Sequence, residues 1–410
     1  MTKWPREWPP FLFGAATSSH QIEGHQSNDW TDWETSGHGR EPSGRATDHW
    51  HLWQDDLALF KSLGINSYRF SLEWSRIEPE PGQFDQAAID HYRAMISWMR
   101  ELGLTPLLTL HHFTFPRWVA RKGAFLHPDA HEWFGRYVHH VVRQLGDLVD
   151  LYVTINEPLV LVVMGYLIGL WPPGGHGFGR ALRLIRRLLD AHRIAYRAVK
   201  SARPGAWVGL AHHLIAFHPW SRLPWDRATS RLLSYLMNDR FLNMVGPDQD
   251  FIGVNYYTRQ YGHLTGGLHP IQSRPGLPVT DMGWEIYPSG LLEVLRQVGR
   301  FERPILITEN GIATEHDPER STFIRDHLTA VATAQQEGLD IRGYFYWSAL
   351  DNFEWAEGYR PRFGLIDVDY DTLKRSLRPS AAVYRAIIEA NRGRYPITVP
   401  SMSSPWASPL

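Results

Sequence analysis

The 410-residue sequence predicts an α/β protein, a single (β/α)8 barrel of the TIM type with extended loops on its C-terminal face. Three observations support this prediction. Eight strand-like runs alternate with amphipathic segments, no break in composition divides the chain, and several runs end in acidic, histidine or aromatic residues. Apolar residues make up 43% of the chain, enough for one large core or two ordinary ones. Because the repeat is continuous, we assign residues 1–395 to one domain.

The predicted strands are runs of β-branched and apolar residues that end at Pro, Gly or polar residues, as is typical of strands covered on both faces. A doubly wound open sheet is the alternative, but Gly14-Ala15-Ala16 lacks the glycine spacing of a phosphate-binding loop. In chain order the strands are Phe11–Ala16, Ser67–Trp74, Pro106–His111, Leu151–Ile155, Trp207–Ala211, Phe251–Tyr256, Pro304–Thr308 and Ile341–Trp347.

Helical periodicity fills the intervals between these strands. The predicted helices are Trp53–Leu63, Gln86–Leu102, Asp129–Leu145, Ala181–Ala202, Ser289–Val298, Thr322–Glu337 and Ala381–Asn391. The apolar run Leu159–Trp171 is too short to span a bilayer, which takes about 20 residues, and predicts a buried helix. Residues Asn28–His49 and Gly266–Pro278 are rich in Gly, Ser and Pro and are expected to form the pocket rim. Residues 396–410 form a Pro/Ser-rich C-terminal tail without periodicity.

Composition narrows the classes of partner. Lys and Arg number 42 against 43 Asp and Glu, so neither nucleic acid nor an anionic membrane is an expected partner, and the substrate is expected to be neutral. The absence of Cys excludes disulfides, thiolate catalysis and Cys-ligated zinc. Residues Met1–Pro10 show no secretory signal, so a cytoplasmic location is expected. The sequence leaves open whether the chain forms a homo-oligomer.

Two glutamates are the strongest functional signal. Glu157 ends the stretch Val153-Thr154-Ile155-Asn156-Glu157-Pro158, and Glu309 ends Pro304-Ile305-Leu306-Ile307-Thr308-Glu309. Each carboxylate follows a predicted buried strand, where the C-terminal face of a barrel presents residues to a ligand. One such residue taken alone favours a simple turn. Two of them suit cleavage of a glycosidic bond, which needs a proton donor and a nucleophile or base on opposite sides of the sugar carbon.

Other predicted strand ends also carry polar or aromatic groups that could share this face. Each has an ordinary structural explanation when taken alone, such as a core histidine, a buried ion pair or a turn residue. Their joint position at one face of one barrel favours a site. They are Gln21, Arg69, Glu73, His111, His112, Asn255, Tyr257 and the stretch from Trp347 to Trp355.

Four segments together resemble family 1 glycoside hydrolases, the β-glucosidase family: residues Phe11–Gly24, Thr154–Pro158, Ile307–Gly311 and Asp351–Trp355. The resemblance runs from about Phe11 to Ile387. It implies a retaining β-glycosidase that hydrolyses terminal β-D-glucosyl residues, and also β-D-galactosyl or β-D-fucosyl residues, from small β-glycosides or oligosaccharides. It implies no cofactor and no metal.

The resemblance also implies the role of each residue. Glu157 matches the acid/base and Glu309 the nucleophile, with Arg69, Tyr257 and Asn255 beside the nucleophile. Arg69 and Tyr257 are expected to hold Glu309 ionised, while its charge keeps Glu157 protonated until the sugar is attached. The residues that match sugar-binding positions are Gln21, His112, Asn156, Glu354 and Trp355, with Trp347 as the platform beneath the sugar and Trp284 as an aromatic wall for the leaving group.

Two features bear on the substrate. A carboxylate at Glu354 would accept hydrogen bonds from a neutral sugar and repel a 6-phosphate, and a Glu at position 157 favours O-glycosides over thioglucosides. The third-strand motif His111–Pro116 reads HHFTFP where most relatives have YHWDLP, so the histidine is retained but its flanks differ. The preference among glucose, galactose and fucose is therefore not fixed by the motifs.

Three other readings remain. A transglycosylase would use the same covalent intermediate. A non-catalytic sugar-binding barrel would be expected to lose one of the two acids. A metal-dependent barrel hydrolase is suggested by 21 His, with pairs at His111-His112, His139-His140 and His212-His213. Adjacent residues on a strand point to opposite faces, so such a pair cannot bind one ion together.

Overall fold

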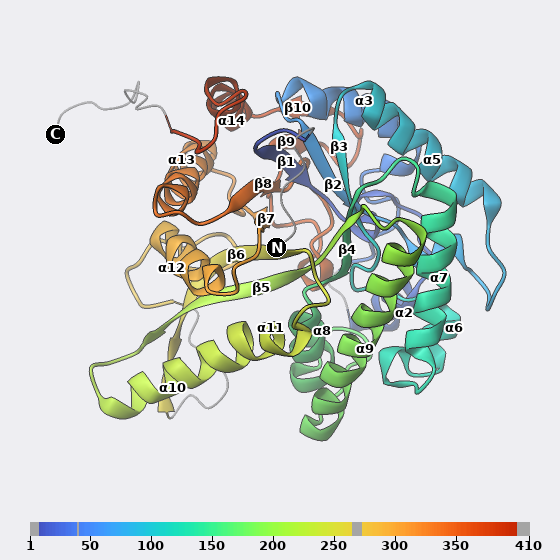
Figure 1. Ribbon diagram of the computed structural model, residues 1–410, viewed down its shortest axis with the longest axis horizontal. Coiled ribbons are helices and arrows are strands. Elements are labelled where there is room, and N and C mark those ends of the chain that lie inside the picture. The colour runs from blue at the N-terminus through green and yellow to red at the C-terminus, as the bar shows by residue number, and fades with distance from the viewer. Residues whose placement is uncertain (1–7, 39–40, 265–272, 400–410) are drawn as a thin grey trace.

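The computed structural model describes residues 8–38, 41–264 and 273–399. Eight parallel strands follow one another around a closed barrel in sequence order, and β8 pairs with β1. Figure 1 shows these strands at the centre of the molecule with helices around them. The predicted (β/α)8 barrel is therefore confirmed.

All eight predicted strands are present. Their bounds are β1 Leu12–Ala16, β2 Ser67–Ser71, β3 Thr105–Thr109, β4 Leu151–Asn156, β5 Trp207–Pro219, β6 Phe251–Gly262, β7 Ile305–Asn310 and β8 Ile341–Trp347. A small antiparallel pair, β9 Ile366–Val368 and β10 Arg375–Leu377, follows the barrel.

The largest differences from the predicted bounds are in three strands and have identifiable reasons. The second strand ends at Ser71 rather than Trp74, because the Glu73 side chain accepts a hydrogen bond from the Ser75 N–H and caps a short helix that begins at Trp74. Strands β5 and β6 continue past the barrel as a paired extension, from Ala216 opposite Arg259 to Pro219 opposite Gly262. Polar residues in this extension hide its strand character from a search for apolar runs.

The seven predicted helices are also present, each within a few residues of its expected bounds. They are α3 His49–Ser62, α5 Gln86–Glu101, α7 Ala130–Leu145, α9 Phe178–Ala202, α12 Pro288–Gly299, α13 Asp317–Gln336 and α14 Pro379–Ala390. Shorter helices and helical turns lie in the loops: α1 Ser19–Ile22, α2 Asp29–Trp33, η1 Glu34–His38, α4 Trp74–Ile77, α6 Arg117–Arg121, η2 Ala124–Leu126, α8 Pro158–Val162, η3 Val163–Ile168, α10 Pro224–Ser234, η4 Tyr235–Asp239, α11 Arg240–Val245 and η6 Trp355–Glu357.

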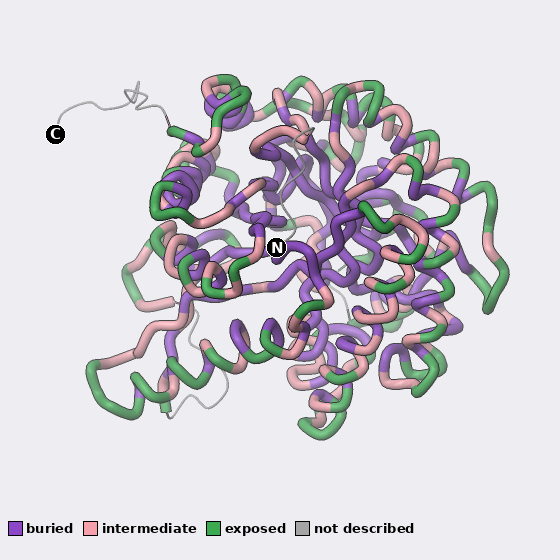
Figure 2. Tube along the Cα trace, in the orientation of Figure 1, coloured by how far each residue is buried: buried purple, intermediate pink, exposed green. Residues whose placement is uncertain are grey.

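The core has two layers, separated by the wall of the barrel. The inner layer consists of alternate strand residues such as Leu107, Leu151, Leu306 and Phe345, and it ends in Trp347. The larger outer layer fills the space between strands and helices. Figure 2 shows the buried strands at the centre and the exposed outer faces of the helices. A wall packed on both sides holds the strand ends rigidly, which suits a site built on them.

Several loop predictions need revision. Residues 159–171 are helical as far as Ile168, but Leu170 is exposed and many of their side chains are only half-buried. The expected rim at 28–49 contains helix α2, and residues 266–272 of the second rim segment lie outside the described residues. Residues 400–410 of the predicted tail also lie outside the described residues. Ile397, which belongs to the predicted tail, is fully buried. Within the described residues, no helix combines the length and apolar character needed to cross a membrane.

Candidate active site

Glu157 stands at a sharp turn between β4 and α8. Its backbone lies in the left-handed region, with φ of 41°, and Pro158 begins the helix after it. Left-handed backbone at a residue other than glycine costs on the order of 1 kcal/mol and is found mostly where structure fixes a functional side chain. The Glu157 N–H donates to the Ala211 carbonyl of β5 at 2.8 Å, so the turn is tied to the neighbouring strand.

Glu309 is the last residue but one of β7. It lies opposite Asn255 of β6, at a shift in strand register. The glycine two residues after Glu309 is required by close packing. A Cβ on Gly311 would lie 1.6 Å from the Trp347 carbonyl oxygen, so only glycine permits this approach of the end of β7 to the end of β8. Asn310 donates to the Tyr256 carbonyl at 2.6 Å, which fixes the strand end.

Both oxygens of Glu309 accept strong hydrogen bonds. Arg69 Nη1 donates to Oε1 at 2.5 Å, and the Tyr257 hydroxyl donates to Oε2 at 2.6 Å. Burial raises the pKa of Glu309 to about 7; the Arg69 guanidinium and the Tyr257 hydroxyl oppose that rise, while Glu157 adds to it. Burial, followed by the charge of Glu309, raises the pKa of Tyr257 well above its usual value, so Tyr257 stays a neutral donor.

Arg69 connects the nucleophile position to the sugar-binding positions. Its Nη2 donates to Asn156 Oδ1 at 2.5 Å, and its Nε donates to the Thr109 hydroxyl at 3.2 Å. Asn156 Nδ2 in turn lies 3.1 Å from His112 Nε2. Burial, with the nearby charge of Arg69, holds the pKa of His112 well below its usual value. His112 is therefore neutral, and its Nε2 accepts from Asn156.

Glu157 is held by neutral or weakly basic groups rather than by arginine. Asn255 Nδ2 donates to Glu157 Oε1 at 2.8 Å, and His213 Nδ1 lies 3.2 Å from the same oxygen. The Thr308 hydroxyl donates to Asn255 Oδ1 at 2.6 Å and so fixes which end of the amide faces Glu157. The two carboxyls thus differ in environment: Glu309 faces a permanent cation, whereas Glu157 does not.

Gln21 and Glu354 form a second polar cluster beside the catalytic candidates Glu157 and Glu309, which are called the dyad below. Gln21 Nε2 donates to Glu354 Oε2 at 3.0 Å, and the Ser18 hydroxyl orients the amide by donating to its Oε1 at 2.7 Å. Burial, followed by the charge of Glu309, raises the pKa of Glu354 to about 8. Burial therefore favours the protonated form of Glu354, an effect that the sequence argument for a charged carboxylate did not include. Charged or protonated, it offers no positive charge to a sugar phosphate.

Aromatic rings enclose these polar groups. The rings of Trp347 and Trp355 both lie nearly parallel to the His112 ring, at centroid distances of 6.0 and 6.1 Å. Trp284 is only half-buried, and its ring lies 5.4 Å from the ring of Tyr257, the partner of Glu309. The structure therefore brings all twelve sequence-predicted site residues into one connected cluster.

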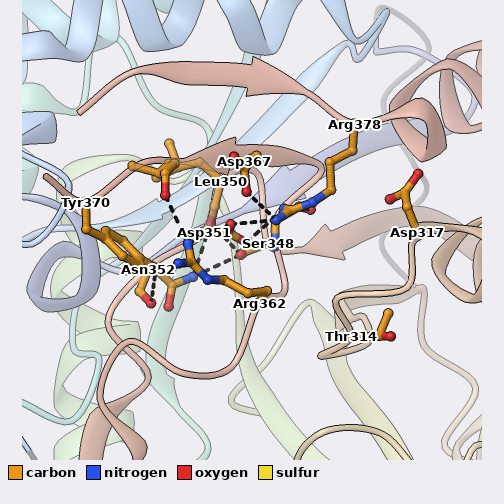
Figure 3. Close-up of polar contacts among 12 residues, drawn as sticks. Thr314, Asp317, Ser348, Leu350, Asp351, Asn352, Arg362, Asp367, Tyr370 and Arg378 are labelled. Carbon is orange, nitrogen blue, oxygen red and sulfur yellow. Dashed lines mark hydrogen bonds and ion pairs between the residues drawn. The ribbon is translucent and has the colours of Figure 1, made fainter. Parts of the chain in front are cut away.

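The loop after β8, which carries Glu354 and Trp355, is fixed by a buried carboxylate. Asp351 accepts from Arg378 Nη1 and Nη2 at 2.9 and 2.8 Å and from Arg362 Nη1 at 3.2 Å. Figure 3 shows the two guanidinium groups turned toward Asp351 from neighbouring segments. Asp351 also accepts from the Gly364 N–H at 2.9 Å. The shape of this loop thus depends on Asp351, which is not one of the predicted sugar-binding residues.

Replacing Asp351 with Asn is expected to lower the apparent free energy of unfolding by about 3 kcal/mol, because two partly buried guanidinium groups lose the fully buried anion that they share. Urea unfolding followed by tryptophan fluorescence measures this. Asp367→Asn is the matched control, since Asp367 also binds Arg378, at 2.7 Å, but its side chain is 48% exposed. It should cost less than about 1 kcal/mol. Equal losses in the two variants would contradict a special role for Asp351.

Two polar strand-end residues lie outside this cluster. The His111 ring packs against Phe115 and Phe125, on the face of the chain opposite His112. Glu73 accepts from the Ser19 and Thr114 hydroxyls and caps α4, which is a structural role.

His213 is the contact that sequence reasoning missed. The sequence argument considered His213 only as half of the His212-His213 pair. Because adjacent residues on a strand point to opposite faces, one histidine of this pair could have been expected to face the barrel interior. His212 packs against Phe241 outside the barrel, and His213 turns toward Glu157. Three further residues orient site side chains through hydrogen bonds, and nothing in the sequence distinguishes them from ordinary strand or loop residues. They are Thr109, Thr308 and Ser18.

Comparisons with known proteins agree with this geometry. The Glycosyl hydrolase family 1 model matches residues 4–247 and 242–393. Beta-glucosidase A of Thermotoga maritima is 33% identical over 436 aligned residues, which cover 93% of this chain and 97% of that protein. A beta-glycosidase from Pyrococcus horikoshii superposes with a TM-score of 0.89 at 42% identity, covering 94% of this chain and 95% of that one.

A beta-glucosidase from Thermotoga maritima, solved in complex with glucoimidazole, gives a TM-score of 0.89 at 30% identity and covers 94% of this chain and 99% of that one. Both the family model and the relatives extend over nearly the whole barrel. The chain therefore belongs to glycosyl hydrolase family 1.

Proposed function

We propose that this enzyme is a retaining β-glucosidase that removes the terminal non-reducing β-D-glucosyl residue from neutral glycosides, with β-D-galactosides and β-D-fucosides as further substrates. The observation that carries the proposal is the difference in environment between two carboxyls, one at the end of β4 and one at the end of β7. Glu309 has an arginine on one oxygen and a phenol on the other, whereas Glu157 has neutral or weakly basic partners. The relatives named beta-glucosidase support the same activity.

In the first step, Glu309 attacks the anomeric carbon while the bond to the leaving-group oxygen breaks. Glu157 gives its proton to that oxygen. The two carboxyls carry one negative charge and one proton between them. Because Arg69 and Tyr257 donate hydrogen bonds to Glu309, the negative charge is more stable on Glu309, and the proton remains on Glu157. Attachment of the sugar removes the charge of Glu309.

In the second step, water attacks the anomeric carbon, the bond to Glu309 breaks, and the water's proton passes to Glu157. The same residue thus acts first as acid and then as base. Two inversions at one carbon give net retention. No residue beyond the dyad has to exchange a proton with the substrate.

The sugar is proposed to lie over Trp347, with its hydroxyls among Gln21, His112, Asn156 and Glu354. His112 supports this arrangement: its Nδ1 is buried without a hydrogen-bond partner within the described residues, while its Nε2 accepts from Asn156. The neutral ring therefore carries its hydrogen on Nδ1, an unused donor of the kind a sugar hydroxyl can satisfy. Trp284 and the rim beyond it are proposed to contact the aglycone.

A panel of p-nitrophenyl glycosides tests the proposal. The β-glucoside, β-galactoside and β-fucoside are expected to be hydrolysed, while the α-glucoside and the β-glucoside 6-phosphate are not. Addition of EDTA should leave the rates unchanged. NMR of the first-formed sugar should show the β-anomer. Inactivity on every unphosphorylated β-glycoside, or a first-formed α-anomer, would contradict the proposal; transfer to an added sugar acceptor would measure any transglycosylation.

A further inference from the structure

One oxygen of Glu157 receives both of the side-chain contacts described above. Asn255 Nδ2 and His213 Nδ1 lie 2.8 and 3.2 Å from Oε1. Asn255 can only donate there, because Thr308 fixes its amide orientation. With Oε1 serving as the acceptor, the acid proton belongs on Oε2. Asn255, together with His213 in the forms that carry a hydrogen on Nδ1, thus donates to one oxygen and selects the rotation of the carboxyl that points a proton at the substrate.

His213 is itself held in place. It belongs to the part of β5 that pairs with β6, opposite Asn255. Its ring lies nearly parallel to the Tyr257 ring, with centroids 6.1 Å apart and an interplanar angle of 22°. Its side chain is 18% exposed, against 9% for Glu157, so it remains in contact with the open space of the site. A residue that only filled the barrel wall would not need a titratable ring at this point.

We propose that His213 is a positioning residue for the acid/base, which orients Glu157 through Oε1 and shares one proton with it. The inference rests on the proposed acid/base role of Glu157. Asn255 orients the same oxygen but cannot change its charge, whereas an imidazole can hold the proton that Glu157 releases. The pH at which the enzyme loses its acid then belongs to the pair rather than to Glu157 alone.

The charged groups around His213 determine the direction of its effect. Burial lowers the pKa of His213, but the charge and hydrogen bond of Glu157 from the end of β4, and then the charge of Glu309 on β7, raise it above its usual value overall. From β6 it faces the ring of Tyr257, which stays neutral. Arg69 from β2 is engaged with Glu309 and Asn156. When Glu157 has released its proton, the nearest charges are thus negative and favour the imidazolium form.

Replacing His213 with Asn is expected to move the basic limb of the kcat/KM profile to higher pH by about 0.5 to 1 unit. This limb reports the loss of the Glu157 proton, and the pKa of Glu157 should rise because its carboxylate form loses a donor that can become a cation. At the optimum, kcat/KM for an alkyl β-glucoside should fall by about 10-fold and that for a p-nitrophenyl β-glucoside by less, since only the alkyl leaving group needs a well-oriented acid. His218→Asn is the matched control: His218 also lies on β5 and pairs with a carboxylate, Glu293, at 2.8 Å. It should leave the profile unmoved.

A measurement without turnover separates this inference from the proposed function. The ring of His213, assigned in two-dimensional ¹H–¹⁵N spectra by its absence from His213→Asn, is expected to titrate above the ordinary histidine pKa of about 6.5. In Glu157→Gln the pKa of His213 should fall by at least about one unit, because burial remains while the negative partner is gone. An unchanged pKa of His213 in Glu157→Gln, or a basic limb that does not move in His213→Asn, would overturn the inference even if Glu157 proved to be the acid.

Discussion

Glu309→Gln is expected to lower kcat on p-nitrophenyl β-glucoside by at least about 10⁴-fold, which corresponds to about 5.4 kcal/mol of lost transition-state stabilisation. An amide cannot form the glycosyl ester, so the first step has no nucleophile. The fold should remain intact, because Gln keeps the size of Glu and its oxygen can still accept from Arg69 Nη1. The measurements are kcat, the melting temperature and binding of a competitive sugar inhibitor. Substantial residual activity, after correction for contaminating wild-type enzyme, would remove Glu309 from the nucleophile role.

The control for this variant is the same change at another buried, arginine-paired glutamate. Glu78 is fully buried, accepts from Trp74 Nε1 at 2.9 Å and pairs with Arg136. Glu78→Gln should lower the melting temperature but keep kcat within about 3-fold, because Glu78 ends helix α4 and its side-chain partners, Trp74, Gly82 and Arg136, are not site residues. If both variants lost activity equally, the effect of Glu309→Gln would be one of stability rather than chemistry.

A Glu309→Ala variant adds a test of stereochemistry. Removing the side chain leaves room for a small anion such as azide or formate on that side of the sugar. Attack from there on a β-glycoside with a good leaving group inverts the anomeric carbon once, so azide should restore turnover and give an α-glycosyl azide. A β-glycosyl azide from this variant would place the nucleophile elsewhere.

The barrel was predictable because its signals are local and repeated. Each of the eight strands has an apolar run that ends at a turn residue, and each predicted helix has a matching periodicity. The failures lie where polar contacts, rather than an apolar run, determine where a strand ends. Glu73 ended β2 early through its own cap, and the extension of β5 and β6 depends on pairing between two polar segments.

The clustering of the twelve candidate residues could be predicted because strand ends and family motifs mark them, but their electrostatics could not. The sequence argument included the effects of Arg69 and Tyr257 on Glu309 and omitted burial, which raises the pKa of both Glu309 and Glu354. Burial depends on the closure of loops from several strands over the pocket, and no single segment encodes it. His213 was missed for the same reason, since its partner lies 56 residues away.

Glu157→Ala is expected to separate substrates by their leaving groups. For an alkyl β-glucoside, kcat/KM should fall by about 10³-fold or more, because the alkoxide cannot leave without a proton. For 2,4-dinitrophenyl β-glucoside, kcat/KM should change by less than about 10-fold, because that phenolate leaves unassisted. Its kcat should still fall strongly, since the second step loses its base and the glycosyl-enzyme accumulates. A burst of dinitrophenolate followed by slow turnover would show this directly.

Azide should restore the second step in Glu157→Ala, because an anion needs no base to attack the anomeric carbon. It would enter on the side that Glu157 occupies, so two inversions give a β-glycosyl azide, the opposite anomer from the Glu309→Ala product. The pair of anomers thus assigns the two carboxyls to opposite sides of the sugar without relying on the size of any rate loss. Equal losses of kcat/KM on alkyl and dinitrophenyl glucosides, with no azide product, would contradict an acid role for Glu157 and leave its left-handed turn with only a structural explanation.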